Sequence, residues 1–206
     1  HLSDLCAKDL EKKGSEVIEH YLHEGQHIVV QVVKDPLGSK GARLTTEISI
    51  PSRYQVYMPY ANNSGVSQRI ECEAERARLR ACLDTFRQEH ACGGFIARTA
   101  AECVEESILI ADMTFLLKLW ESILEKIASA KPKQFIHKDL PLSVRTLRDL
   151  YKEGIDRVRV DSKETYHRLL EFAEVFVPEI VPVIEHYTGE CPVFDIYSVE
   201  DEIKKA

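Results

Sequence analysis

The order of apolar and polar positions in the first third of the chain predicts short strands. Residues 28–33 are a run of β-branched side chains broken by one glutamine, and residues 42–50 alternate between apolar and polar types. Both patterns are typical of strands. Turn-forming residues fill positions 35–41, and a further strand is expected over residues 54–58. We therefore expect a small antiparallel sheet with a tight turn after its first strand.

Longer apolar patterns with helical spacing occupy much of the remaining chain. Gly25 should end the first helix and the Gly93-Gly94 pair the second, and Asp161 with Glu164 three residues later resembles a capping box. Helices are expected over residues 15–24, 71–91, 107–130, 140–152, 161–177 and 198–206, with extended pieces over 66–70, 94–99, 155–160 and 180–185. This mixture predicts an α+β (mixed α/β) fold.

The composition bears on the cellular location of the protein and on the distribution of its charge. The 206 residues allow one or two domains, carry a net charge of −7, and contain no apolar run long enough to span a membrane. Six scattered cysteines without a CxxC pair, and no signal peptide, favour reduced thiols in a cytoplasmic protein. Residues 34–98 hold ten Lys and Arg against seven Asp and Glu. A basic segment in an acidic chain suits a directed binding face.

The first candidate site is the basic turn. Lys34, Lys40 and Arg43 lie at or beside the turn between the first two expected strands. Lysines at the rim of a small sheet suit a nucleic-acid backbone. A solvated hairpin tip explains the same pattern. The residues alone leave both interpretations open.

The second candidate site is the Arg98-Thr99 pair at the end of an expected strand. Arginine offers a planar fork of donors that matches a phosphate, and threonine adds a hydroxyl. Such a pair can hold a terminal monophosphate, which is a dianion, whereas an internal phosphodiester has one charge and two ester arms. An exposed arginine at a strand end is the alternative.

Five ordered motifs give the chain a resemblance to a known family. They are KDPLGSKGARLTT, SRYQVYMP, GVSQRIE, GGFIARTAAE and HYTGECPVFD, and they run in order along nearly the whole chain. Together they resemble the ribonuclease E/G family of bacterial endoribonucleases. Ordered motifs at family spacing are far more specific than one short pattern.

The resemblance implies a domain organisation. Residues 1–47 would be part of an S1 (OB-type) RNA-binding domain, and residues 48–140 a 5′-sensor domain inserted in it. Residues 141–206 would be the second part of an RNase H-like domain that is not catalytic. The chain would then be a fragment that lacks the family's catalytic domain.

The resemblance also implies site residues. The side chains of Arg98 and Thr99, with main-chain groups of Val56, would bind the 5′ monophosphate of RNA. Lys34 and Lys40, with Arg43 as a weaker candidate, would bind the RNA backbone. No catalytic residue is expected within these 206 residues.

The implied activity belongs to the full-length protein. It is cleavage of single-stranded RNA in rRNA maturation and mRNA decay, with Mg²⁺ in a catalytic domain and a structural Zn²⁺ that links protomers into a homo-oligomer. The fragment alone is expected to bind 5′-monophosphorylated single-stranded RNA without metal. Two alternatives are a stand-alone, non-catalytic RNA-binding module and a purely structural interaction domain.

Three further groups were weighed against these sites. His20, His23 and His27 have a spacing that a metal site could use, but the expected stop at Gly25 separates the last one, so we interpret them as exposed histidines. The acidic set Asp161, Glu164, Asp195 and Asp201 is interpreted as structural. In loop 102–106, three carboxylates near the expected phosphate pocket would oppose binding unless they point away.

Overall fold

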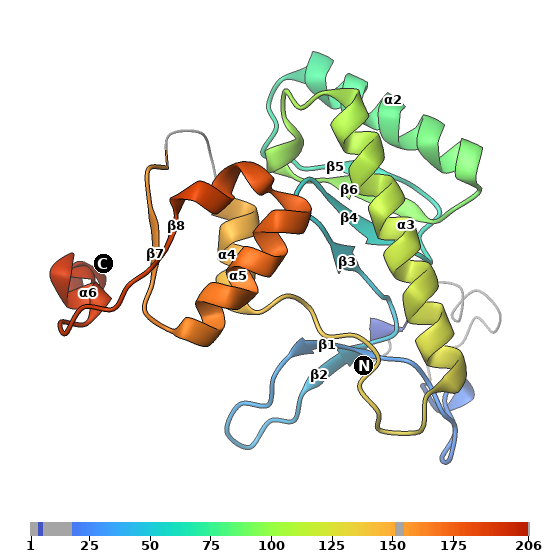
Figure 1. Ribbon diagram of the computed structural model, residues 1–206. Coiled ribbons are helices and arrows are strands. Elements are labelled where there is room, and N and C mark those ends of the chain that lie inside the picture. The colour runs from blue at the N-terminus through green and yellow to red at the C-terminus, as the bar shows by residue number, and fades with distance from the viewer. Residues whose placement is uncertain (1–3, 6–17, 151–154, 206) are drawn as a thin grey trace. The chain divides into compact units, whose positions relative to one another are not determined.

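The computed structural model describes residues 4–5, 18–150 and 155–205 (Figure 1). The chain divides into two compact units, residues 1–137 and 138–206. Each unit combines helices with short strands, which confirms the predicted α+β class.

The first unit begins with an isolated hairpin. Strands β1 (Gln31–Lys34) and β2 (Arg43–Thr45) pair antiparallel. Both expected strands are present but shorter than predicted. Val32 and Leu44 face each other across the hairpin, yet they are 50% and 44% exposed. The hairpin therefore adds little to the core of this unit, and its place in an S1 barrel stays a prediction.

A four-stranded sheet with two helices forms the body of the first unit. The strand order is β3-β4-β6-β5, in which only β5 and β6 run parallel. The elements are β3 (Ile50–Pro51), β4 (Gln55–Met58), β5 (Gly65–Val66), α2 (Glu73–His90), β6 (Gly94–Ala97) and α3 (Glu106–Ser129). Helix α2 packs on β5 and β6, and helix α3 packs on β4.

One face of this sheet carries the core. Gln55 and Tyr57 are buried, and Ala97 and Phe95 lie directly opposite them on β6. Because side chains alternate along a strand, Val56 lies on the other face, where it is half-buried. The helices complete the core with Leu79, Leu83 and Phe86 from α2, and with Leu109, Met113, Leu116, Trp120 and Ile123 from α3.

The second unit has its own core. Strands β7 (Val158–Val160) and β8 (Ile184–His186) pair in parallel, and helix α5 (Lys163–Phe176) connects them. Helix α4 (Leu142–Leu150) packs on α5. The core comprises Val144, Leu147, Leu169, Ala173, Val177, Ile180 and Ile184. Two short helices follow, α6 (Val193–Ile196) and α7 (Val199–Lys205).

Several expected boundaries are wrong. In the described part of 15–24 there is only a 3-10 turn, η2 (Ile18–His20), rather than an α-helix. The N-cap of α5 is Ser162, whose hydroxyl accepts from Thr165 N at 3.2 Å, and not Asp161. Residues expected to be extended from Ile180 begin instead with a 3-10 helix, η4 (Pro178–Val183).

The Gly93-Gly94 pair has a different role from the one expected. Helix α2 ends three residues earlier, where Ala91 adopts a left-handed conformation (φ 46°). Neither glycine has a positive φ. A Cβ on Gly94 would collide with the carbonyl oxygen of Asn63, and one on Gly93 with that of Met58. The pair thus permits close backbone approach to the loop that follows β4.

Candidate functional site

The backbone of Arg98 is fixed by the sheet. Arg98 follows β6 directly and keeps an extended conformation (φ −80°, ψ 166°). Its N–H donates to Tyr54 O at 2.8 Å. Because Gln55 pairs with Ala97, the β3–β4 turn lies beside Arg98. Alternation along the strand places the Arg98 side chain on the same face as Ile96 and its partner Val56.

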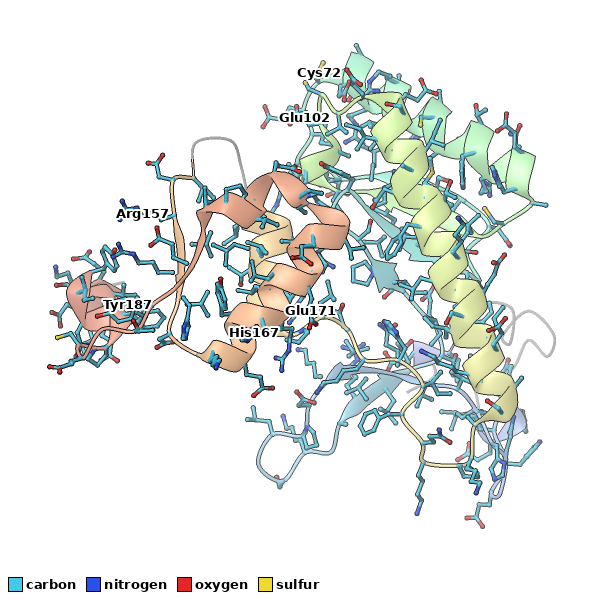
Figure 2. The ribbon with its side chains drawn as sticks, in the orientation of Figure 1. Cys72, Glu102, Arg157, His167, Glu171 and Tyr187 are labelled. Atoms are coloured by element: carbon cyan, nitrogen blue, oxygen red, sulfur yellow. The ribbon has the colours of Figure 1, made fainter. Side chains whose placement is uncertain are left out.

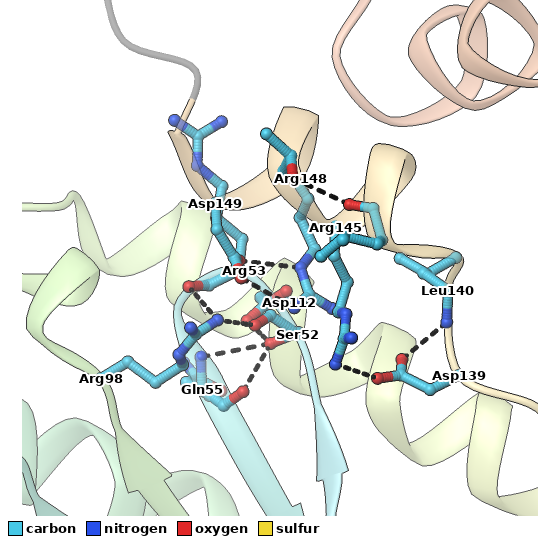
Figure 3. Close-up of polar contacts among 12 residues, drawn as sticks. Ser52, Arg53, Gln55, Arg98, Asp112, Asp139, Leu140, Arg145, Arg148 and Asp149 are labelled. Carbon is cyan, nitrogen blue, oxygen red and sulfur yellow. Dashed lines mark hydrogen bonds and ion pairs between the residues drawn. The ribbon is translucent and has the colours of Figure 1, made fainter. Parts of the chain in front are cut away.

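The guanidinium of Arg98 is oriented by that turn (Figure 3). Its Nη1 donates to Ser52 O at 2.6 Å and to Arg53 O at 3.3 Å. The side chain is half-buried. Two carbonyls that bind one nitrogen set the plane of the guanidinium, and a fixed plane is the geometry that two-point recognition of an anion requires.

Thr99 brings a second segment to the site. Thr99 is exposed and begins the 3-10 turn η3 (Thr99–Ala101), and its Oγ1 lies 3.3 Å from Ser67 Oγ. Ser67 N donates to Ala97 O at 2.8 Å, and Arg76 Nη1 donates to Ser67 O at 2.8 Å. The hydroxyls of Thr99 and Ser67 are thus neighbours at the strand end. Ser67 lies within the GVSQRIE motif, but the sequence did not predict it as a site residue.

The structure therefore brings together two of the three predicted phosphate-binding residues and places the third on the adjacent strand. Arg98 and Thr99 are consecutive at the end of β6. Val56 lies between Pro51 of β3 and Ile96 of β6, on a central strand of the sheet. The sequence did not predict Ser52, which accepts a hydrogen bond from Arg98, or Asp112, which binds the Ser52 hydroxyl.

Helix α2 holds the acidic loop. Glu75 accepts two hydrogen bonds from Arg78, at 2.7 and 2.8 Å, and one from Cys103 N at 2.8 Å. Arg78 also donates to Val104 O at 2.9 Å. Mainly because of the bonds from Arg78, the pKa of Glu75 falls from its ordinary 4.5 to about 2. Figure 2 labels Glu102, the first carboxylate of this loop, and Cys72, the residue that precedes α2.

The basic hairpin forms a separate part of the first unit. Leu37 and Lys40 close the turn with reciprocal backbone hydrogen bonds of 3.0 and 3.1 Å. Lys34 and Lys40 are exposed. Arg43 is exposed too, but it forms an ion pair with Asp4 at 2.7 Å. Its hydrogen bond lowers the pKa of Asp4. A neighbouring carboxylate opposes phosphate binding by Arg43 more than by the two lysines.

The described residues offer no metal site. None of their groups of three or more His, Cys, Asp or Glu side chains could hold a metal ion. His20, His23 and His27 are exposed, and Glu164 pairs with Arg168 at 2.6 Å. The described cysteines, which exclude Cys6, are free thiols. Among the helices of the described ranges, none is both long and apolar enough to cross a membrane.

Comparison with known proteins identifies the family of this chain, and the names of its relatives are those of ribonucleases. The sequence profile of the Ribonuclease E/G family matches residues 49–206, so the chain belongs to that family.

Curated relatives cover the whole chain but extend well beyond it. Ribonuclease G of Escherichia coli K12 is 46% identical over 213 residues, which span 100% of this chain and 43% of that protein. Ribonuclease G of Haemophilus influenzae is 45% identical over 203 residues, 98% of the chain and 41% of the relative. Ribonuclease E of Nostoc sp. PCC 7120 is 32% identical over 209 residues, 100% of the chain and 30% of the relative. The chain thus spans less than half the length of these relatives.

Proposed function

We propose that this chain is the RNA-recognition part of an endoribonuclease that cuts single-stranded RNA in rRNA processing and mRNA decay. In this proposal Arg98 and Thr99, with main-chain groups of Val56, bind the 5′ monophosphate of the substrate. The observation that carries the proposal is the orientation of Arg98 by the carbonyls of Ser52 and Arg53, next to an exposed hydroxyl on Thr99. Membership of the Ribonuclease E/G family supports it.

The chemistry of the site favours a terminal phosphate. A guanidinium held in one plane donates two parallel hydrogen bonds to two oxygens of the same phosphate. Hydroxyls from Thr99 and Ser67 add further donors at the same strand end. A terminal monophosphate has three unesterified oxygens and about two negative charges, whereas an internal diester has two such oxygens and one charge. The terminal group therefore gains more from this set of donors.

Cleavage is assigned to residues outside this chain. The proposal places Mg²⁺-assisted hydrolysis, a structural Zn²⁺ and a homo-oligomeric assembly in the remainder of the full-length protein. The donor sets of the described residues do not fit either metal. Those residues would instead bind and orient RNA, with residues 1–47 acting as part of an S1 domain.

The first test compares two RNA ends. A short oligouridylate with a fluorophore at its 3′ end, carrying either a 5′ monophosphate or a 5′ hydroxyl, is titrated with the chain at fixed salt and followed by fluorescence anisotropy. We expect the monophosphate to bind about tenfold more tightly, since a charge-assisted pair is worth about 1.5–3 kcal/mol before screening. Arg98→Ala should abolish the preference.

Arg157→Ala provides a control for a lost positive charge, because Arg157 is an exposed arginine of the second unit. It should keep the preference. Equal binding of both RNA ends by the unaltered chain would contradict 5′ sensing, and salt-dependent binding without preference would favour a simple RNA-binding module.

A further inference from the structure

A carboxylate that the proposed phosphate contacts do not use binds the same turn residue, Ser52, that Arg98 binds. We propose that Asp112 is a positioning residue, which acts through Ser52 to hold the Arg98 guanidinium in place for the 5′ phosphate of RNA. This inference rests on the proposed function and adds what orients its central side chain. It predicts that a residue with no place among the phosphate ligands controls the discrimination between RNA ends.

Ser52 connects the two charged side chains (Figure 3). Its hydroxyl lies 2.5 Å from Asp112 Oδ2 on helix α3, and its carbonyl accepts from Arg98 Nη1 at 2.6 Å. Ser52 is only 5% exposed. Asp112 and Arg98 therefore fix opposite groups of one buried residue, the hydroxyl and the carbonyl.

The Ser52 hydroxyl has one proton and can donate it to only one acceptor at a time. Two acceptors lie within reach, Asp112 Oδ2 at 2.5 Å and Gln55 O at 2.9 Å. The carboxylate is the closer acceptor and makes the stronger, charge-assisted bond. Gln55 O keeps a donor regardless, because Ser52 N donates to it at 2.8 Å. The hydroxyl oxygen can then accept from Gln55 N at 3.2 Å. With the proton directed to Asp112, the Ser52 hydroxyl, the Ser52 N–H and the Gln55 N–H each have a hydrogen-bond partner.

Asp112 is a fixed anchor. Its neighbours on α3, Leu109 and Met113, are 1% and 0% exposed, so the helix is locked in the core. Gln55, which is fully buried, donates through Nε2 to Leu109 O at 3.1 Å and attaches the same turn to the same helix. The turn and the helix therefore cannot shift past each other without loss of both bonds.

Removal of the Asp112 carboxylate removes one of the bonds that hold Ser52, whose carbonyl binds Arg98. The Ser52 hydroxyl would rotate to Gln55 O, and the Ser52 carbonyl would lose its constraint. A displacement of a fraction of an ångström suffices to spoil two-point binding of a phosphate, because such bonds depend steeply on distance and angle. RNA with a 5′ hydroxyl makes no such contact, so its affinity should not change.

The experiment measures the ratio of dissociation constants for 5′-hydroxyl and 5′-monophosphate oligouridylate. Asp112→Ala and Ser52→Ala should each lower this ratio about fivefold, and the double variant should lower it no further. Asp112→Asn, which keeps an acceptor oxygen and the side-chain shape, should retain part of it. Binding of 5′-hydroxyl RNA should stay within about twofold in all variants. Glu125→Ala, an exposed carboxylate on the same helix, controls for net charge and should change nothing.

A second measurement is independent of RNA. The ¹⁵N side-chain signals of Arg98 should report a restrained guanidinium in the unaltered chain and an averaged one in Asp112→Ala. Unchanged Arg98 signals, or an unchanged ratio in a folded Asp112→Ala variant, would overturn the positioning role. An unaltered chain with no end preference would instead contradict the proposed function, and shifted Arg98 signals would still support positioning by Asp112.

Discussion

At the scale of single residues, the candidate site combines two kinds of group: Arg98 and Thr99 follow β6 directly, whereas Ser52 and Asp112 meet only through packing. Arg98 and Thr99 could be predicted because they follow an apolar strand directly and carry the right donors. Ser52 and Asp112 could not, since sixty positions separate them and only the packing of α3 on β4 brings them together. The capping-box pattern predicts Asp161 as the helix cap, whereas Ser162 caps the helix; both residue types are good N-caps, and sequence patterns place element ends poorly.

Glu75 illustrates how one carboxylate can hold a loop. It is 13% exposed and binds both Arg78 and Cys103 N. We expect Glu75→Gln to lower the free energy of unfolding by about 1–2 kcal/mol at neutral pH, because Arg78 is 37% exposed and solvent screens the pair. Glu73→Gln is the matched control, because Glu73 also lies in the first turn of α2 but is 91% exposed and lies 3.7 Å from its partner.

The sign of the pH dependence follows from the lowered pKa of Glu75. The contribution is complete above the ordinary value of 4.5 and is lost as pH falls towards about 2. The difference in stability between Glu75→Gln and the unaltered chain, measured by urea unfolding from neutral pH down to about pH 3, should therefore become smaller as the pH falls. A difference that stays constant or widens over this range would exclude this role for Glu75.

At the scale of elements, long helices were predictable and short strands only in part. Helices expected over 71–91 and 107–130 lie at 73–90 and 106–129, because a wide apolar stripe and flanking turn formers bound them. Strands of two to four residues carry too little periodicity to fix their ends. The helix expected over residues 15–24 was predicted wrongly in its described part, because its apolar face has too few residues to offset the cost of helix nucleation.

Gly94 shows why composition alone can misassign an element boundary. A buried glycine with an ordinary φ is needed here for space, and Gly94→Ala should destabilise the chain by about 1–3 kcal/mol through overpacking against Asn63. Gly41→Ala meets no atom within 4 Å and serves as the control. It should leave stability unchanged or raise it slightly. Chemical denaturation of the two variants compares them, and equal stability would contradict the close approach at Gly94.

At the scale of the whole molecule, charge is unevenly distributed. The chain carries a net charge of −7, yet residues 34–98, which include the basic turn and Arg98, hold ten Lys and Arg against seven Asp and Glu. The division into two compact units, each with its own core, agrees with the length of the chain. That result depends on contacts between elements distant in the sequence.

The lysines of the hairpin should affect both RNA ends alike. Lys34→Gln with Lys40→Gln should lower the slope of log K against log salt by about 1.4, since each phosphate contact to single strands contributes about 0.7. Arg43→Gln should have a smaller effect because Asp4 already pairs with it. Lys118→Gln with Lys126→Gln removes the same charge from exposed positions of α3 and should leave the slope nearly unchanged. Equal slopes in the two double variants would mean that the hairpin does not contact RNA.

The exposure of the hairpin's apolar side chains should lower its affinity for RNA. A two-stranded sheet this short, with Val32, Val33, Leu37 and Leu44 open to water, has little stability of its own. RNA that binds Lys34 and Lys40 would therefore contact a segment that few core contacts restrain. Part of the favourable electrostatic free energy is spent on ordering, so any neighbouring surface that covers these side chains would strengthen RNA binding without touching the RNA.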